Sequence, residues 1–324
     1  MNDKQISLFK NEFPQVLENE LMSKHTNLNI GGLARLYLPV SISDLEPAVE
    51  LAKKLDIQFY ILGGGSNLLV SDDGFDGLVL QTNFRNINFK NQVAIVEAGA
   101  ILSLVAREAA ELGLTGLEWG IGIPGTVGGA VYGNAGAWGG ETGDVIVTVD
   151  VLDTQTMERR VLTKADCKFL YRESLFKKNK NLVILKVMFG LKKGDSQEIN
   201  QKMENIVQSR KDRQPLDKKS AGCMFKNYEF QDEKELDRLK ANAESIPQSM
   251  LDKKSISAGW LVEQVGMKGE RLGNVQVSEK HANFIVNLGN ARAQDYLMLT
   301  SKIKMKIRDE YNIMLQDEVQ LLGF

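Results

Sequence analysis

Two glycine-rich segments are the first places in this 324-residue sequence where the backbone itself could bind a ligand. The run Gly63-Gly64-Gly65-Ser66-Asn67 directly follows an apolar stretch, 57–62, that reads as a strand. Glycines let successive N–H groups turn toward an anion without interference from a Cβ, and Ser66 and Asn67 add side-chain donors. The run suits a diphosphate, although a tight turn that needs positive φ would explain a single run of this kind equally well.

The second segment is longer and shifts the balance toward binding. Residues 120–140 contain nine glycines, and a glycine-rich loop of this length is rarely a simple connection. It would let a flat, polar cofactor lie close to the backbone. The stretch 120–125 does match G-x-G-x-x-G, but Leu117-Glu118-Trp119 is a poor strand and Pro124 follows, so a Rossmann site is disfavoured. The lysine of a P-loop follows neither run.

Two arginines extend the apolar face of a helix expected over 195–212. The stripe of Ile199, Met203 and Ile206 continues through Arg210 and Arg213 by helical steps. Such a pair indicates a charged group to be met at the domain junction. The alternative is a pair of arginines whose stems cover apolar surface while their heads reach water.

Composition excludes several classes of function. The net charge of −2 gives no reason to expect a nucleic acid or an anionic membrane as partner, and no stretch is apolar for the roughly 18 residues of a membrane span. Two cysteines without CxxC spacing and two histidines predict neither a metal site nor a disulfide scaffold. The first residues lack the apolar core of a signal peptide, so we expect a reducing, cytoplasmic compartment.

The coarse pattern mixes helices and strands, which favours an α+β fold. Ser43 and Glu46 have capping-box spacing ahead of a helix that carries Leu45, Val49 and Ala52 on one face. Further helices are expected at 101–112 (ending at Gly113), 258–265 (ending at Gly266) and 293–311. Strands are expected at 36–38, 57–62, 68–70, 77–80, 93–99, 145–152, 183–189 and 313–322.

The motifs in their order resemble those of the UDP-N-acetylenolpyruvoylglucosamine reductases. They span about residues 25 to 323, and each is modest alone but strong in combination. The matching segments are Asn29-Ile30-Gly31-Gly32, 62–67, 122–129, Tyr171-Arg172-Glu173-Ser174, 220–227, 258–264, 281–287 and 315–319.

The resemblance implies an FAD-binding domain of the vanillyl-alcohol-oxidase type, in two subdomains, followed by an α+β substrate-binding domain. We place these parts at 1–81, 82–208 and 209–324. The last expected strand, 313–322, is left open between the third part and a return to the FAD domain.

The resemblance also implies the reaction and its ligands. NADPH reduces a non-covalently bound FAD, and hydride then reaches the terminal carbon of an enolpyruvyl ether carried by a UDP-sugar. The expected cofactor-binding residues lie in the two glycine-rich segments: Gly63, Gly64, Gly65, Ser66, Asn67, Pro124, Gly125, Thr126, Gly128, Gly129, Asn134 and Gly136. Arg210, Arg213, Lys226 and Asn227 are expected to meet the UDP and its diphosphate.

Three residues match the family's catalytic positions. Arg172 would hold the substrate carboxylate, because a guanidinium matches a planar carboxylate by paired hydrogen bonds. Glu318 matches the catalytic glutamate. Cys223 departs from the family, whose Ala-Gly-Ser pattern here reads Ala-Gly-Cys. A thiol, with a reference pKa of about 8.5, is competent as a proton donor. We read Cys167, His25 and His281 as structural.

Two other functions remain open at this point. An FAD-dependent oxidase of sugars or alcohols on the same fold would require only the two glycine-rich segments. A ligand-binding protein without turnover is the other alternative, and the departure at Cys223 is its only support.

Overall fold

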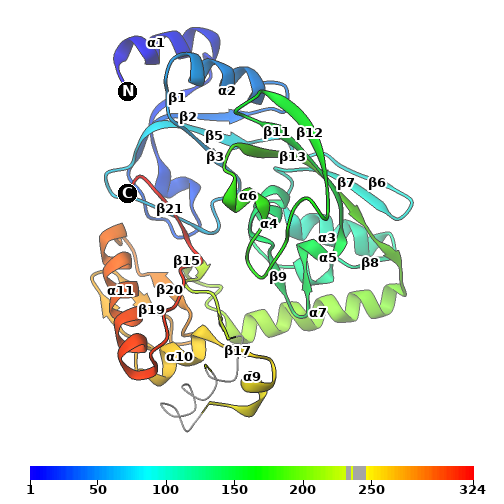
Figure 1. Ribbon diagram of the computed structural model, residues 1–324, viewed down its shortest axis with the longest axis vertical. Helices are drawn as coiled ribbons and strands as arrows, with labels where there is room; N and C mark the ends of the chain where they lie inside the picture. Colours follow the sequence, from blue (N-terminus) through cyan, green and yellow to red (C-terminus); the bar gives the residue numbers. More distant parts are fainter. Residues whose placement is uncertain (231–234, 236–245) are drawn as a thin grey trace. The chain divides into compact units, whose positions relative to one another are not determined.

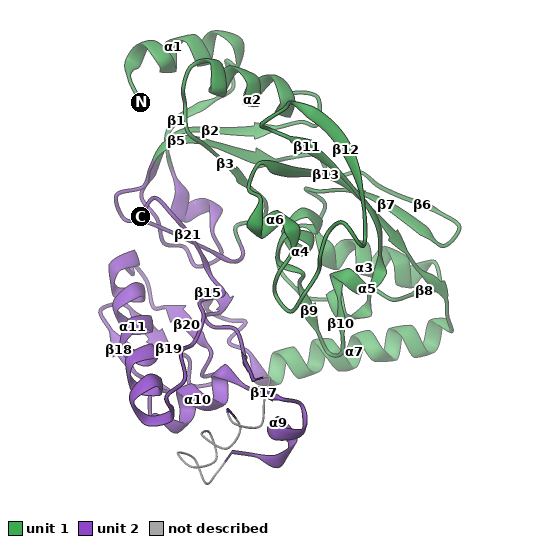
Figure 2. Ribbon diagram, viewed as in Figure 1, with its two compact units in different colours: residues 1–20, 34–65, 76–212 green, residues 21–33, 66–75, 213–324 purple. Residues whose placement is uncertain are grey.

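The chain forms two compact units, each built from separate stretches of sequence (Figure 2). The structure is a computed structural model that describes residues 1–230, 235 and 246–324. Unit 1 contains Met1–Glu20, Ala34–Gly65 and Asp76–Asp212, and unit 2 contains Leu21–Leu33, Ser66–Phe75 and Arg213–Phe324. The division crosses the first glycine run, between Gly65 and Ser66.

The first layer of unit 1 is a small sheet with two helices (Figure 1). Its strand order is β1-β2-β5-β3, and β3 runs parallel to β5. The elements are α1 (Asp3–Glu12), β1 (Leu17–Leu21), β2 (Leu33–Val40), α2 (Leu45–Lys54), β3 (Phe59–Leu62) and β5 (Phe75–Thr82). Helix α2 buries Leu45, Ala48, Val49 and Ala52, the three- and four-residue spacing expected of one helix face.

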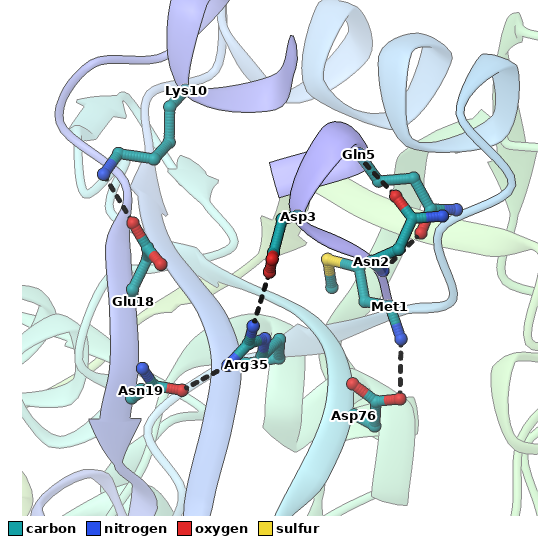
Figure 3. Close-up of polar contacts among 9 residues, drawn as sticks. All are labelled: Met1, Asn2, Asp3, Gln5, Lys10, Glu18, Asn19, Arg35 and Asp76. Atoms are coloured by element: carbon teal, nitrogen blue, oxygen red, sulfur yellow. Dashed lines mark hydrogen bonds and ion pairs between the residues drawn. The ribbon is translucent and has the colours of Figure 1, made fainter. Parts of the chain in front are cut away.

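Polar contacts anchor the start of the chain to this layer (Figure 3). The Met1 ammonium lies 2.7 Å from a carboxylate oxygen of Asp76. Asn2 and Gln5 form a reciprocal capping box at the start of α1. Arg35 of β2 donates to Asn19 and forms an ion pair with Asp3. The cap and these contacts hold α1 in place, and its buried Ile6 and Phe9 join the core of unit 1.

The second layer of unit 1 is a five-stranded antiparallel sheet of order β12-β11-β13-β7-β6. Its strands are β6 (Ile87–Lys90), β7 (Val93–Glu97), β11 (Ile146–Asp153), β12 (Glu158–Thr163) and β13 (Leu182–Gly190). The remaining elements are α3 (Leu102–Glu111), β8 (Leu114–Thr115), the short 3₁₀ turn η2 (Glu118–Gly120), α4 (Val127–Gly133), β9 (Gly136–Ala137), β10 (Gly140–Glu141), α5 (Thr142–Val145), α6 (Leu175–Lys178), β14 (Lys192–Lys193) and α7 (Ser196–Arg213).

Unit 2 has its own sheet and its own apolar core. The antiparallel sheet has the order β15-β20-β19-β18, and β21 pairs in parallel with β4. The elements are η1 (Met22–His25), β4 (Leu68–Val70), β15 (Lys219–Cys223), β16 (Tyr228–Glu229), α9 (Gln248–Asp252), β17 (Ser255–Ile256), α10 (Ala258–Gln264), β18 (Arg271–Leu272), β19 (Val275–Val277), β20 (Phe284–Asn287), α11 (Ala293–Tyr311) and β21 (Gln320–Leu322). The α+β fold class is confirmed.

Two local expectations are wrong. Ser43 and Glu46 do not form a capping box, because α2 begins at Leu45 with Asp44 at its cap and no side-chain cap bond. Ser41 instead bonds Ser43 and Asp44 within the preceding turn. The strand expected over 313–322 is also shorter, since β21 covers only Gln320–Leu322.

Within the described residues, every helix is too short or too polar to cross a lipid bilayer. The same residues contain no cluster of three or more His, Cys, Asp and Glu side chains arranged to hold a metal ion.

Candidate active site

The two glycine-rich segments lie against each other in unit 1. Gly63 directly follows β3, and a Cβ built there would lie 2.7 Å from the Thr126 hydroxyl oxygen. A Cβ on Gly64 would lie 2.9 Å from the Gly125 Cα. The first contact is with a side chain, but the second is with backbone, so a Cβ at Gly64 would collide with the chain itself. Gly64, Pro124 and Gly129 are exposed, so part of this paired backbone faces outward, where a cofactor could contact it.

The second segment is not the single long loop expected from its composition. It contains η2, helix α4 and the hairpin of β9 and β10. The Thr126 hydroxyl accepts from the Gly129 N–H at the start of α4, which satisfies one backbone donor of the helix end. Gly128 lets α4 approach the turn that follows β7, because a Cβ there would lie 2.9 Å from the Ala98 Cβ. Close packing in the folded unit thus overrides the low helix propensity of glycine.

A buried carboxylate that our sequence analysis missed holds the beginning of this segment. Glu118 is 3% exposed; it accepts from the Thr115 hydroxyl and the Gly116 N–H and lies 3.7 Å from the Lys202 ammonium. Burial alone would raise its pKa, but the hydrogen bonds outweigh burial and hold the pKa below its ordinary value. The three-residue spacing of Thr115 and Glu118 was the available signal.

Arg172 lies beside the end of α4. It has a left-handed backbone, with φ of 54°, and its guanidinium donates to the Gly136 carbonyl at 2.7 Å and lies over the Tyr171 ring. Asn134 caps α4, donates to the Leu170 carbonyl and accepts from the Gly143 N–H. Both ends of that amide are therefore engaged within unit 1. The structure brings Asn134 and Gly136, expected to contact the cofactor, next to Arg172.

Arg210 and Arg213 differ in their surroundings. Arg210 is 8% exposed, and its guanidinium lies over the Trp138 ring, 5.5 Å from the ring centroid. A Cβ on Gly122 would lie 3.2 Å from the Arg210 side chain, so this arginine packs directly against the second glycine-rich segment. Arg213 is exposed at the last residue of α7. The two arginines, which spacing placed on one helix face, thus differ in burial.

In unit 2 the structure brings Cys223 and Glu318 close together, although they are far apart in sequence. Cys223 ends β15, and the next three residues pair with the segment that carries Glu318. The Glu318 N–H donates to the Met224 carbonyl at 2.9 Å, the Lys226 backbone N–H donates to the Gln316 carbonyl at 2.9 Å, and Phe225 forms an antiparallel bridge with Asp317. Backbone pairing thus holds Glu318 beside the residue that follows Cys223.

Two amide side chains support this pairing. Asn283 accepts from the Phe225 N–H and donates to the Phe225 carbonyl. Asn67 donates its side-chain amide to the Glu318 carbonyl at 3.0 Å, so this residue of the first glycine run holds the segment that carries Glu318. Asn227 accepts from the Ala258 N–H at the start of α10.

Comparison with known proteins identifies relatives over nearly the whole chain. Residues 214–322 match the family model of the UDP-N-acetylenolpyruvoylglucosamine reductase C-terminal domain, and residues 34–160 match that of an FAD binding domain. A UDP-N-acetylenolpyruvoylglucosamine reductase of Caldicellulosiruptor bescii is 38% identical over 319 residues, 97% of this chain and 93% of its own length. The reductase of Thermotoga maritima is 38% identical over 304 residues, covering 93% of this chain and 97% of its own.

A solved structure agrees with these relatives. The crystal structure of UDP-N-acetylenolpyruvylglucosamine reductase from Thermus caldophilus has a TM-score of 0.74 at 32% identity, covering 95% of this chain and 98% of its own. The C-terminal match is the part that a sugar or alcohol oxidase would not require. That alternative is therefore not supported.

Proposed function

The chain belongs to the UDP-N-acetylenolpyruvoylglucosamine reductase family, and from this premise we propose how its own residues carry out the reaction. The enzyme reduces UDP-N-acetylenolpyruvoylglucosamine to UDP-N-acetylmuramate, a precursor of peptidoglycan, with NADPH as the hydride donor and FAD as the cofactor. What remains to be assigned is the role of each residue.

The residues of unit 1 fit FAD. The cofactor, when bound, supplies the hydride carrier between NADPH and the substrate. We assign the paired backbone of 63–65 and 124–129 to its diphosphate region, where exposed glycines offer N–H groups without side chains. Thr126 and Asn134 shape this backbone from inside the protein, because their side chains bond within unit 1. Ser66 is assigned to the cofactor as an additional donor.

We assign Arg172 to the substrate carboxylate. Hydride addition to the terminal carbon of the enolpyruvyl group develops negative charge on the adjacent carbon and its carboxylate, and a fixed guanidinium stabilises that charge. The contacts of Arg172 with Gly136 and Tyr171 fix its orientation before the substrate binds.

We assign Cys223 as the proton donor and Glu318 to the same half-reaction. The thiol S–H bond breaks, a C–H bond forms at the carbon next to the carboxylate, and the electron pair stays on sulfur as a thiolate, which regains a proton from solvent. The observation that supports this assignment is the backbone pairing of 224–226 with 316–318, in which Glu318 pairs with Met224, the residue after Cys223.

We assign Arg210, Arg213, Lys226 and Asn227 to the UDP portion of the substrate. Their surroundings differ, and so do the roles we propose for them. Arg213 is exposed and suits a diphosphate as a direct contact. Arg210 is buried against Trp138, so it also organises the second glycine-rich segment. Asn227 bonds the start of α10, which would position Lys226 beside it.

The location and partners follow from the substrates. We propose a cytoplasmic enzyme, since NADPH and UDP-sugars are cytoplasmic metabolites, with small molecules and no nucleic acid as its partners. We keep, as a prediction about function, the division into an FAD-binding part at 1–81 and 82–208 and a substrate-binding part at 209–324. The two compact units described above are a separate, structural division of the chain.

The role of Cys223 is tested by two substitutions. Cys223→Ser keeps a small proton donor at the same position and should retain product formation. Cys223→Ala removes the proton, and product formation should fall by about 10²–10⁴-fold, the usual loss of general acid catalysis. Product is measured by mass spectrometry after mixing substrate with enzyme already reduced by NADPH. Full activity of Cys223→Ala would move the donor to another residue or to water.

A further inference from the structure

Arg172 has a backbone conformation that arginine rarely adopts. The Leu170 N–H donates to the Glu173 carbonyl at 3.1 Å, and the Glu173 N–H donates to the Leu170 carbonyl at 3.0 Å. These two bonds close a tight turn whose central residues are Tyr171 and Arg172. The φ of Arg172 is 54°, and a positive φ at the third residue of a turn ordinarily belongs to glycine or asparagine. An arginine that keeps such a backbone must be held in it by its surroundings.

Helix α6 supplies a contact that holds this turn. The Lys177 ammonium donates to the Arg172 backbone carbonyl at 2.7 Å, five residues back in the chain. A charged donor makes a stronger hydrogen bond than a neutral one. Because the bond is made to the peptide unit directly after the strained φ, it opposes rotation of the Arg172 backbone to a more relaxed conformation.

The helix that carries Lys177 is itself anchored within unit 1. Ser174, at the cap of α6, accepts from the Lys177 N–H at 3.4 Å and donates its hydroxyl to the Tyr132 carbonyl of α4 at 2.7 Å. Ser174 is 1% exposed, and α6 packs beside α4 (Figure 1). Lys177 therefore reaches Arg172 from an element that is fixed to the second glycine-rich segment.

The other contacts of this turn act on different atoms. The Arg172 guanidinium donates to the Gly136 carbonyl at 2.7 Å and lies over the Tyr171 ring. The Asn134 amide donates to the Leu170 carbonyl at 2.9 Å. These contacts hold the head of the arginine and the first residue of the turn, whereas Lys177 holds the peptide unit that follows Arg172.

We propose that Lys177 is a positioning residue for Arg172, whose ammonium holds the strained backbone from which the guanidinium meets the substrate carboxylate. The proposal rests on the carboxylate-binding role assigned to Arg172 above. Lys177 transfers no proton and acts through the arginine. Because the guanidinium stabilises charge that develops during hydride addition, its displacement lowers kcat more than it raises KM.

The test compares three variants of the FAD-loaded enzyme. Lys177→Met keeps the length of the side chain and removes the donor, whereas Lys177→Arg keeps a cationic donor. Lys178→Met, at the neighbouring exposed position of α6, is the matched control. Product formation by the NADPH-reduced enzyme is measured by mass spectrometry, flavin reduction by stopped-flow absorbance, and folding by the thermal midpoint.

Lys177→Met should lower kcat about tenfold, as expected from the loss of one charged hydrogen bond that orients a catalytic group, with a smaller rise in KM. Its rate of flavin reduction and its thermal midpoint should stay unchanged. Lys177→Arg should restore most of the activity, and Lys178→Met should change nothing. An unchanged kcat in Lys177→Met, or a loss that Lys178→Met shares, overturns the proposal.

A double substitution separates positioning from direct action on the substrate. If Lys177 acts through Arg172, adding Lys177→Met to Arg172→Ala costs no further activity, whereas losses that multiply overturn the proposal. Full activity of Arg172→Ala would reject the role of the arginine and with it that of the lysine. A slow Arg172→Ala beside a normal Lys177→Met would reject the role of Lys177 alone. Should Lys177→Met not fold, Lys177→Ala replaces it in every measurement.

Discussion

The two thiols of this chain have different surroundings, and this difference decides which of them can take part in chemistry. Cys167 is fully buried, and burial, with the nearby charge of Asp166, raises the pKa of its thiol to about 11. Cys223 is half-buried at the end of β15 and follows Gly222, whose Cβ position faces open space. A thiol in that position can both give a proton to a ligand and react with reagents from solvent.

Glu318 should matter for the second half-reaction only. Glu318→Gln keeps the size of the side chain and removes its charge, so we expect product formation to fall about 100-fold or more while NADPH still reduces the flavin at its normal rate. Stopped-flow absorbance separates the two steps.

The control for this substitution is Glu310→Gln, which neutralises an exposed carboxylate at the end of α11 and should leave both steps intact. If flavin reduction slowed in Glu318→Gln as much as product formation did, the residue would act on the cofactor and our assignment would be wrong.

At the scale of the elements, contact between the two glycine-rich segments makes a sharp prediction. Gly64→Ala places a methyl group 2.9 Å from the Gly125 Cα, and neither backbone can move without opening the paired segments. We expect FAD affinity to fall at least about tenfold, measured by flavin retention during gel filtration and by fluorescence titration.

Gly133→Ala is the matched control, because a Cβ there meets nothing within 4 Å and the residue is the last of α4. Alanine is a better helix former than glycine, so this variant should bind FAD normally and be no less stable. Normal FAD binding by Gly64→Ala would show that the cofactor does not need this contact.

Helix α7 presents its two arginines to different surroundings, and the variants should differ accordingly. Arg213→Ala should raise KM for the UDP-sugar about tenfold with little change in kcat or in thermal stability, because the side chain is exposed. Arg210→Ala should raise KM as well and also lower the thermal midpoint, since it removes a buried guanidinium from Trp138. An unchanged KM in both variants would return the pair to a structural role.

Local patterns predicted most elements but not all of their ends. The apolar spacing of 293–311 predicted α11, and Gly113 and Gly266 do follow the ends of α3 and α10 with positive φ. The capping-box spacing of Ser43 failed because Asp44 takes the cap position, and spacing alone does not say which residue of a polar turn does so. Glu118 was missed although its spacing from Thr115 was a signal, because spacing alone does not show that a carboxylate is buried and hydrogen-bonded.

At the scale of the whole molecule, the proposed functional residues are distributed over both units. The paired glycine-rich backbone and Arg172 belong to unit 1, and Cys223 and Glu318 belong to unit 2. Their chemistry could be assigned from sequence only through the resemblance, since spacing alone makes Arg172 and Glu318 ordinary surface charges. The parallel pairing of Leu68–Val70 with Gln320–Leu322 shows what sequence patterns do not predict, namely which distant segments come together. Periodicity shows that a strand exists but not which distant strand it joins.

The central claim is that this chain reduces an enolpyruvyl UDP-sugar through bound FAD, and one anaerobic titration tests it directly. The purified protein should be yellow, and NADPH should bleach the flavin absorbance. Addition of UDP-N-acetylenolpyruvoylglucosamine should then restore the oxidised spectrum and yield UDP-N-acetylmuramate, heavier than the substrate by two hydrogen atoms. A protein that stays colourless after FAD is added, or a reduced flavin that the UDP-sugar leaves bleached, would contradict the account.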